Sequence, residues 1–188
     1  MALTVKRTGF GQVEPNHLSA QRTSQIYAQL PAAADIEILE NGQFVKYNYA
    51  DGVCDFEGEG EWMMVFNEIK LYDDFWRETY KDFAMQAKNF TPGTEDITHG
   101  GLGPFKGQMT PRVFKTNVGD IFTTNAIEAG NTSGSAVIEG VELSVGDELS
   151  PNEKGFLSLN GDGSIVFQVV KEYTLPDGQP AVKVMRIK

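Results

Sequence analysis

The stretch 164–187 constrains the fold most, because it holds two apolar-rich runs separated by a strong turn signal. Side chains alternate along Ile165–Val170 and again along Val182–Ile187, with the period of two that a β-strand requires. Between the runs, Leu175-Pro-Asp-Gly178 supplies a proline that fixes φ and a glycine that accepts a positive φ. The pattern predicts a β-hairpin at the C-terminal end.

Composition places the chain among ordinary globular proteins. It has 188 residues, enough for one substantial core or two small ones, of which 40% are hydrophobic and 22% charged. The single Cys54 fits a reducing compartment and permits no intrachain disulfide. No apolar run approaches the roughly 20 residues that span a bilayer, and Met1–Arg7 lacks the apolar core of a signal peptide. We therefore expect a product that stays in the cytoplasm where it is made, with no membrane partner.

The net charge of −10 is unevenly distributed along the chain. The first thirty residues hold Lys6, Arg7 and Arg22 against the single acidic residue Glu14, whereas the remainder carries 13 basic and 25 acidic residues. An acidic body repels nucleic acid, so no nucleic-acid partner is expected. The slightly basic segment could meet an acidic protein surface, or its charge could have no consequence.

Residues 1–34 show no sustained period, and glycine and proline interrupt them repeatedly. We expect an N-terminal extended arm that lies on its own body or on a partner, with a disordered tail as the alternative. Within it, Ser19–Leu30 could form a short helix capped by Ser19. The candidate partner-binding residues of the arm are its larger apolar side chains: Phe10, Leu18, Ile26, Tyr27 and Leu30.

Residues 35–90 predict a β-rich region. The dipeptide Asn41-Gly42 is a strong hairpin turn signal, so 36–49 is interpreted as a second hairpin. Turns are expected at Asp51-Gly52 and over 57–60, and 61–69 is expected to be a strand buried on both faces in its middle. Residues 71–87 could be a helix or an ordered loop. Their aromatics Phe75 and Trp76 either complete the core or bind a partner.

Residues 91–106 are interpreted as a linker, and 107–188 as a small C-terminal β-barrel or sandwich. A Val-Gly-Asp phrase occurs at 118–120 and again at 145–147, and each copy predicts a turn that feeds a strand. Two such short copies do not establish a true repeat. The predicted fold class is mainly β: the arm, the β-rich region and the small barrel or sandwich, with at most one or two short helices.

Residues capable of catalysis or metal binding are sparse. His17, His99 and Cys54 lie far apart in the sequence, and no nucleophile elbow is present, so neither a zinc site nor a Cys–His or serine site is predicted. Calcium binding at 160–163 is less favoured than a β-turn. The carboxylates of one glycine-spaced stretch suit a solvated strand face, or the catalytic pair of a β-sandwich glycosidase: Asp55, Glu57, Glu59, Glu61 and Glu68. We predict no catalytic, cofactor-binding or metal-binding residue.

Several phrases resemble the small structural proteins of tailed-bacteriophage virions, in particular head decoration or auxiliary capsid (cement) proteins. They are GQFVKYNYADG, EWMMVFNEIKLYDD, KTNVGDIFTTN and, carrying most of the likeness, the phrasing of 145–184. The resemblance covers about half of the chain and includes no diagnostic motif. It implies a non-enzymatic β-rich module without a cofactor, on the head surface of a virion, that binds the major capsid protein lattice and stiffens it. It further implies a homo-oligomer, for which a trimer is one candidate.

Three alternatives stay open. A tail or connector component resembles the chain in the same way. A carbohydrate-binding or carbohydrate-active β-sandwich would use Trp62 or Trp76 as a sugar platform beside the acidic stretch. A bacterial scaffold or adhesion module is disfavoured by the missing signal peptide.

Overall fold

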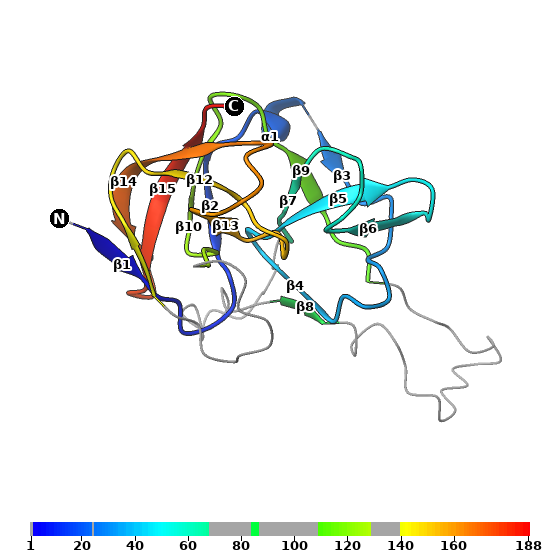
Figure 1. Ribbon diagram of the computed structural model, residues 1–188, viewed down its shortest axis with the longest axis horizontal. Coiled ribbons are helices and arrows are strands. Elements are labelled where there is room, and N and C mark those ends of the chain that lie inside the picture. Colours follow the sequence, from blue (N-terminus) through cyan, green and yellow to red (C-terminus); the bar gives the residue numbers. More distant parts are fainter. Residues whose placement is uncertain (1, 24, 68–83, 87–108, 129–139) are drawn as a thin grey trace.

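The computed structural model describes residues 2–23, 25–67, 84–86, 109–128 and 140–188 (Figure 1). It is mainly β, which confirms the predicted fold class, and the described residues contain one short helix, α1 (Ser19–Thr23). The strands are β1 (Leu3–Val5), β2 (Val13–His17), β3 (Ile26–Tyr27), β4 (Ile38–Glu40), β5 (Phe44–Asn48), β6 (Val53–Asp55), β7 (Met63–Val65), β8 (Ala84–Gln86), β9 (Val113–Lys115), β10 (Ile121–Thr124), β11 (Val141–Leu143), β12 (Glu148–Pro151), β13 (Leu157–Ser158), β14 (Phe167–Thr174) and β15 (Pro180–Arg186).

Two larger sheets organise the molecule. A six-stranded sheet has the order β13-β12-β14-β15-β10-β2, and a five-stranded sheet has the order β3-β9-β7-β5-β6. They occupy the left and right halves of Figure 1. Two small antiparallel pairs, β1-β11 and β4-β8, complete the described strands. Because β9 pairs with both β7 and β3, the five-stranded sheet draws on all three predicted regions of the chain, which therefore do not fold as separate β units.

The predicted C-terminal hairpin is confirmed and lies at the centre of the six-stranded sheet. Strands β14 and β15 pair antiparallel along their length, and β12 and β10 flank them. The turn closes where the Gly178 amide donates to the Leu175 carbonyl over 2.8 Å, with Gly178 at a φ of 85°. The inward side chains Phe167 and Val169 are buried, as the alternation predicted.

The two Val-Gly-Asp phrases form matching turns, over 117–120 and 144–147. In each, the first residue's amide donates to the aspartate carboxylate over 2.8 Å, and the aspartate amide donates back to the first residue's carbonyl. Their glycines have φ values of 92° and 102°. One turn feeds β10 and the other feeds β12, on opposite sides of the hairpin. The repeated phrase therefore encodes a repeated turn, as predicted.

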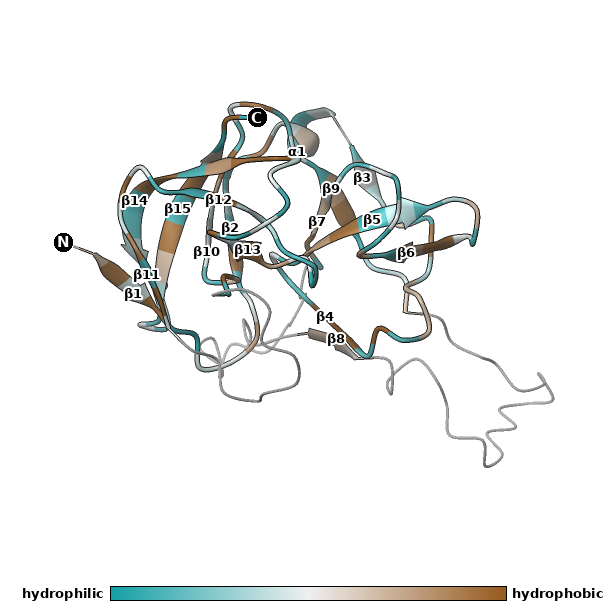
Figure 2. Ribbon diagram, viewed as in Figure 1, coloured by the Kyte–Doolittle hydropathy of each residue, from teal (hydrophilic) through white to brown (hydrophobic). Residues whose placement is uncertain are grey.

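The main core cluster lies between the two sheets. Phe44 of β5 packs against Phe167 of β14 and Phe122 of β10, with ring centroids 5.4 and 6.4 Å apart. Met64 and Phe114 face the same cluster from β7 and β9. Figure 2 shows hydrophobic residues concentrated in strands such as β9 and β15. The core therefore joins the N-terminal and C-terminal parts of the chain in one packed unit.

A second buried cluster covers the opposite face of the five-stranded sheet. Side chains alternate along β7, so Met64 faces the main core whereas Met63 and Val65 face the second cluster. Leu39 of β4 and Met85 of β8 pack against this face. The five-stranded sheet is therefore covered on both faces, as predicted for the strand that includes β7.

The predicted arm is part of the body. Strands β1, β2 and β3 and helix α1 all lie within residues 1–34, and each of these strands pairs with a strand from the C-terminal region. Docking on its own body was one of the two expected arrangements. The predicted helix over 19–30 is wrong beyond Thr23, because Ile26–Tyr27 pairs with β9 instead. Ser19 also differs from a capping residue, since its hydroxyl donates to Asp120 over 2.9 Å.

The predicted 36–49 hairpin is wrong in its pairing, although the turn exists. Gly42 has a φ of 87°, but β4 pairs with β8, and β5 pairs with β6 and β7. The turn is held from outside: Gly42 donates to the Val65 carbonyl over 2.9 Å, and the Asn67 amide donates to the Asn41 side chain over 2.7 Å. These contacts direct the two strands into different sheets. The Asp51-Gly52 turn does close a hairpin, β5-β6.

The region 71–87 is described only at its end. Ala84–Gln86 forms β8, so these residues are neither helix nor loop. The interpretations of Phe75, Trp76 and the linker 91–106 lie outside the described residues. Within the described ranges, no helix is long and apolar enough to cross a membrane.

Candidate functional site

The structure places most of the predicted partner-binding residues against the body. Leu18 is 3% exposed and belongs to the main core, so it is not available to a partner. Tyr27 and Leu30 each pack against the second cluster, and Phe10 is half-buried. Ile26 pairs with Phe114 through the backbone of β3. Residues 75 and 76 lie outside the described ranges. The apolar residues of this segment therefore attach it to its own chain.

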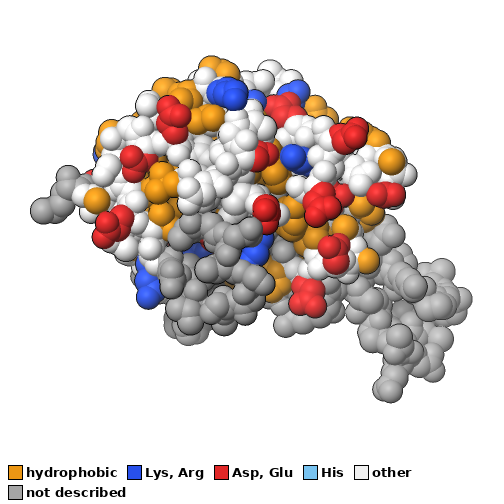
Figure 3. Space-filling model, in the orientation of Figure 1, with side chains coloured by type: hydrophobic (Ala, Val, Ile, Leu, Met, Phe, Trp, Pro, Cys, Tyr) orange, Lys and Arg blue, Asp and Glu red, His pale blue; other side chains and the backbone are white. Residues whose placement is uncertain are grey.

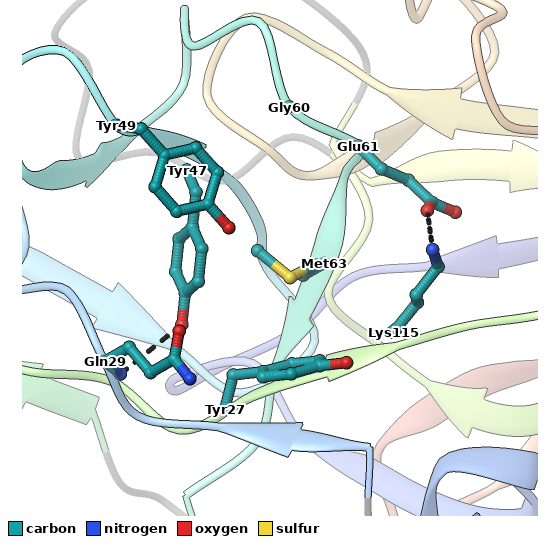
Figure 4. A pocket seen from close by; sticks show the side chains of 8 residues that line it. All are labelled: Tyr27, Gln29, Tyr47, Tyr49, Gly60, Glu61, Met63 and Lys115. Carbon is teal, nitrogen blue, oxygen red and sulfur yellow. Dashed lines mark hydrogen bonds and ion pairs between the residues drawn. The ribbon is translucent and has the colours of Figure 1, made fainter.

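A pocket of about 260 Å³ opens at one end of the second cluster (Figure 4). The five-stranded sheet supplies half of its lining residues, one each from β3, β5, β7 and β9. The lining residues are Tyr27, Gln29, Tyr47, Tyr49, Gly60, Glu61, Met63 and Lys115. These residues come from four separate stretches of the chain, and antiparallel pairing across the sheet brings them together.

Tyr47 and Tyr49 form the aromatic wall of the pocket. Their ring centroids lie 5.8 Å apart and their planes meet at 82°. Tyr47 is buried, whereas Tyr49 is 74% exposed at the end of β5. Burial raises the pKa of Tyr47, and its hydroxyl accepts a long hydrogen bond of 3.5 Å from the Gln29 amide. The Tyr47 phenol therefore stays neutral at ordinary pH and keeps its proton for donation.

An ion pair forms the opposite side of the pocket. Lys115 Nζ and an Arg186 guanidinium nitrogen each lie 2.8 Å from the Glu61 carboxylate. Partial burial by itself would raise the pKa of Glu61, but the hydrogen bonds and attraction from Lys115 and Arg186 outweigh it and lower that pKa. The same hydrogen bond raises the pKa of Lys115. Glu61 and Lys115, the two charged residues of the lining, therefore both stay ionised and paired.

Two carboxylates of the acidic stretch that suggested a catalytic pair, those of Asp55 and Glu61, make structural contacts, whereas Glu57 and Glu59 are exposed. The Asp55 carboxylate accepts the Glu57 amide over 3.0 Å and the Asn48 side-chain amide over 3.1 Å, which holds the turn after β6. Glu61 is the ion-paired residue of the pocket. Glu68 lies outside the described residues. The geometry therefore gives Asp55 and Glu61 roles in holding strands and turns together.

Trp62 is buried, which removes it as a sugar platform. Its side chain is 3% exposed, its indole N–H donates to Asp162 over 2.7 Å, and Lys46 Nζ lies 4.4 Å from its ring centroid. Asp162 also accepts the Ser164 hydroxyl over 2.7 Å, as expected of the predicted turn at 160–163. The Trp62 form of the carbohydrate hypothesis is therefore wrong.

Metal-ligating side chains do not gather in the part of the chain that the structure describes. No group of three or more His, Cys, Asp and Glu residues there could hold a metal ion. Cys54 is fully buried, and burial raises the pKa of its thiol to about 12, so the thiol stays protonated. His17 is exposed in β2, and His99 lies outside the described residues.

Sequence reasoning missed the tyrosine wall, although one signal for it was present. Tyr47 and Tyr49 stand two residues apart in front of the Asp51-Gly52 turn, and in a strand that spacing puts both rings on the same face. No local signal brings Tyr27 or Lys115 to them, because both arrive through β3 and β9. No protein-family model matches this chain, and no solved structure gives a significant match. Its function therefore has to be argued from its own residues and contacts.

Proposed function

We propose that this chain is a non-enzymatic structural protein of a tailed-phage virion that binds the outer capsid lattice and stabilises the head. The resemblance of residues 145–184 to decoration proteins supports this proposal. The observation that carries it is that charged side chains connect parts of the chain that are far apart in sequence and so make the body rigid.

Arg7 makes the most extensive of these connections. Its guanidinium pairs with Glu40 and lies 3.3 Å from Glu128, with its centre 4.6 Å above the ring of Phe156. Its side chain is almost fully buried, and burial lowers the pKa of Arg7 while the attraction of Glu128 opposes that shift. One residue of the N-terminal segment thus contacts three distant segments of the chain.

Three further ties cross the fold in the same way. The Asp120 carboxylate accepts the amide and hydroxyl of Ser19, at 2.8 and 2.9 Å. Asp177, in the C-terminal hairpin turn, accepts the Gln12 side-chain amide over 2.6 Å. Asp162 accepts the Trp62 indole N–H. A body cross-linked in this way is preorganised, so it loses little conformational freedom on docking, and its contacts with a lattice contribute more fully to affinity.

Exposed apolar turns provide candidate contacts with the lattice in place of the predicted arm residues. Val118 and Val145 occupy equivalent positions in the two matching turns and are 69% and 60% exposed. Figure 3 shows small apolar areas between scattered acidic side chains on one face of the molecule. Many weak contacts of this kind, repeated over a lattice, suffice for a decoration protein. A homo-oligomer, such as a trimer, would match lattice sites that are themselves symmetric.

Co-sedimentation with tailed-phage heads stripped of their decoration protein tests the proposal. The purified full chain should pellet saturably, at a fixed ratio to the major capsid protein. A Val118→Asp variant and a Val145→Asp variant should each pellet less, whereas Ala50→Asp, which adds the same single negative charge at the exposed β5-β6 turn, should pellet like the wild type. A wild-type protein that stays in the supernatant would refute the lattice role.

A further inference from the structure

The pocket beside Tyr49 is not needed for the proposed lattice binding. Lattice contacts are assigned to Val118 and Val145, which are not among the residues that line the pocket. The pocket walls contribute little to stability at their exposed rim, since Tyr49 is 74% exposed. An exposed aromatic side chain beside an ion-paired carboxylate therefore calls for a separate explanation.

The lining combines flat apolar surfaces with many hydrogen-bonding groups. The rings of Tyr27, Tyr47 and Tyr49 and the Met63 thioether provide the apolar part, and Figure 4 shows the three rings and Met63 around one space. The phenol groups, the Gln29 amide, the Glu61 carboxylate and the Lys115 ammonium provide donors and acceptors at its edges. A ligand with one apolar face and several hydroxyl groups matches this lining.

Charge and size narrow the ligand class. Glu61 is neutralised by Lys115 within the pocket and by Arg186 beside it, so the lining offers no free carboxylate for a cation. Lys115 is already paired, so it is a poor partner for a phosphate or another anion. The volume of about 260 Å³ lies just below the range of roughly 300–1,000 Å³ that drug-sized ligands occupy. The occupant is therefore neutral and small.

We propose that this pocket binds a neutral saccharide and holds one pyranose ring against the exposed face of Tyr49. The C–H face of the sugar packs on the aromatic ring, while Glu61 accepts from and Lys115 donates to its hydroxyl groups. The buried Tyr47 ring braces Tyr49 from behind, through their edge-to-face contact of 5.8 Å. This assignment uses residues other than the tryptophans that the sequence suggested, and it does not depend on the lattice role.

Methionine-methyl NMR of the full chain tests the assignment, because Met63 lines the pocket. Protein labelled with ¹³C at its methionine methyl groups is titrated with glucose, galactose, mannose and N-acetylglucosamine, and is then screened on an array of neutral glycans. We expect at least one neutral saccharide to shift the Met63 methyl resonance saturably while the Met64 resonance, on the opposite face of β7, stays in place.

Two variants distinguish binding in the pocket from non-specific binding to the protein surface. Tyr49→Ala should weaken binding roughly tenfold or more, as loss of a central aromatic contact does. Tyr173→Ala, which removes a tyrosine from β14 in the other sheet, should leave it unchanged. The assignment is overturned if every neutral glycan fails to bind or if binding survives Tyr49→Ala. Pelleting of Tyr49→Ala with phage heads is a separate readout, so either proposal can fail alone.

Discussion

The two faces of the five-stranded sheet differ in how completely they are covered. On one face, Phe44, Met64 and Phe114 are sealed against the six-stranded sheet. On the other, the cluster around Val45 and Val65 is covered by β4 and β8 at one end and opens into the tyrosine pocket at the other. Successive side chains of one strand point to opposite faces of the sheet. One side chain therefore lies in the sealed core, and the next lies in the cluster that opens into the pocket.

The sealed face contributes mainly to stability, whereas the open face carries the proposed binding pocket. The sealed face joins distant parts of the chain, so damage there should affect the whole fold. The open face ends in side chains such as Tyr49, whose removal costs little packing. Comparing substitutions on the two faces therefore tests the structural account and the binding account independently.

The largest effect is expected from Phe44→Ala on the sealed face. Phe44 is fully buried between Phe122 and Phe167, so truncation leaves a cavity in the main core. The free energy of unfolding should fall by about 3–5 kcal/mol. Urea denaturation measures it, with an unchanged m-value indicating that the unfolded state is unaltered. A loss below about 1 kcal/mol would mean that this face is not sealed.

Arg7→Met tests whether the ion pairs of Arg7 hold β4 against the second cluster. Glu40 ends β4, whose Leu39 packs on that face, and Arg7 pairs with both Glu40 and Glu128. Removing the cation leaves two partly buried carboxylates unpaired, which should cost about 3 kcal/mol.

The control for this prediction is Lys6→Met at the exposed neighbouring position, which should change the free energy of unfolding by no more than about 0.5 kcal/mol. Equal denaturation midpoints for the two variants would contradict the placement of residues 1–34 within the body.

Glu61→Gln tests how much the ion pairs at the pocket rim contribute to stability, through the dependence of stability on pH. The folded-state pKa of Glu61 lies below its ordinary value of 4.5, so its ion pairs stabilise the fold above that pH and are lost as pH falls through the lowered pKa. The variant should therefore show a shallower loss of melting temperature below about pH 4.5.

Because Glu61 is partly exposed, the effect should stay below about 1 kcal/mol. Glu59→Gln, at an exposed neighbouring position, should reproduce the wild-type pH profile of the melting temperature. If Glu61→Gln also keeps the wild-type slope, the ion pairs do not contribute to stability.

The smallest effect on stability is expected from Tyr49→Ala on the open face. The side chain is largely exposed, so the free energy of unfolding should change by no more than about 0.5 kcal/mol. Thermal denaturation checks this. A drop of several degrees would show that Tyr49 is part of the packed structure, and its proposed role as a sugar platform would then lose its basis.

Local sequence signals predicted the hairpin and the turns whose partner residues lie close in sequence. Alternation and the Leu175–Gly178 turn gave the C-terminal hairpin, and each Val-Gly-Asp phrase gave a turn and the strand after it. In these elements the partner strand or the capping carboxylate lies only a few residues away. Short-range chemistry therefore sufficed.

Long-range pairing could not be predicted in the same way. Asn41-Gly42 does form a turn, but contacts from Val65 and Asn67 send the strands on its two sides into different sheets. The N-terminal segment looked like an arm because β1 and β3 are only three and two residues long. The pocket could not be predicted either, because it depends on long-range pairing. Strands β3 and β9 bring Tyr27 and Lys115 to Tyr47 and Tyr49.

Oxidation of the adjacent residues Met63 and Met64 tests the contrast between the two faces most directly. Met64 is sealed in the main core, whereas Met63 lines the open pocket. Native protein is treated with dilute hydrogen peroxide, and fragment-ion mass spectrometry assigns sulfoxide to each residue over time. The account predicts that Met63 is oxidised first and that Met64 follows only on unfolding. Equal rates, or earlier oxidation of Met64, would contradict it.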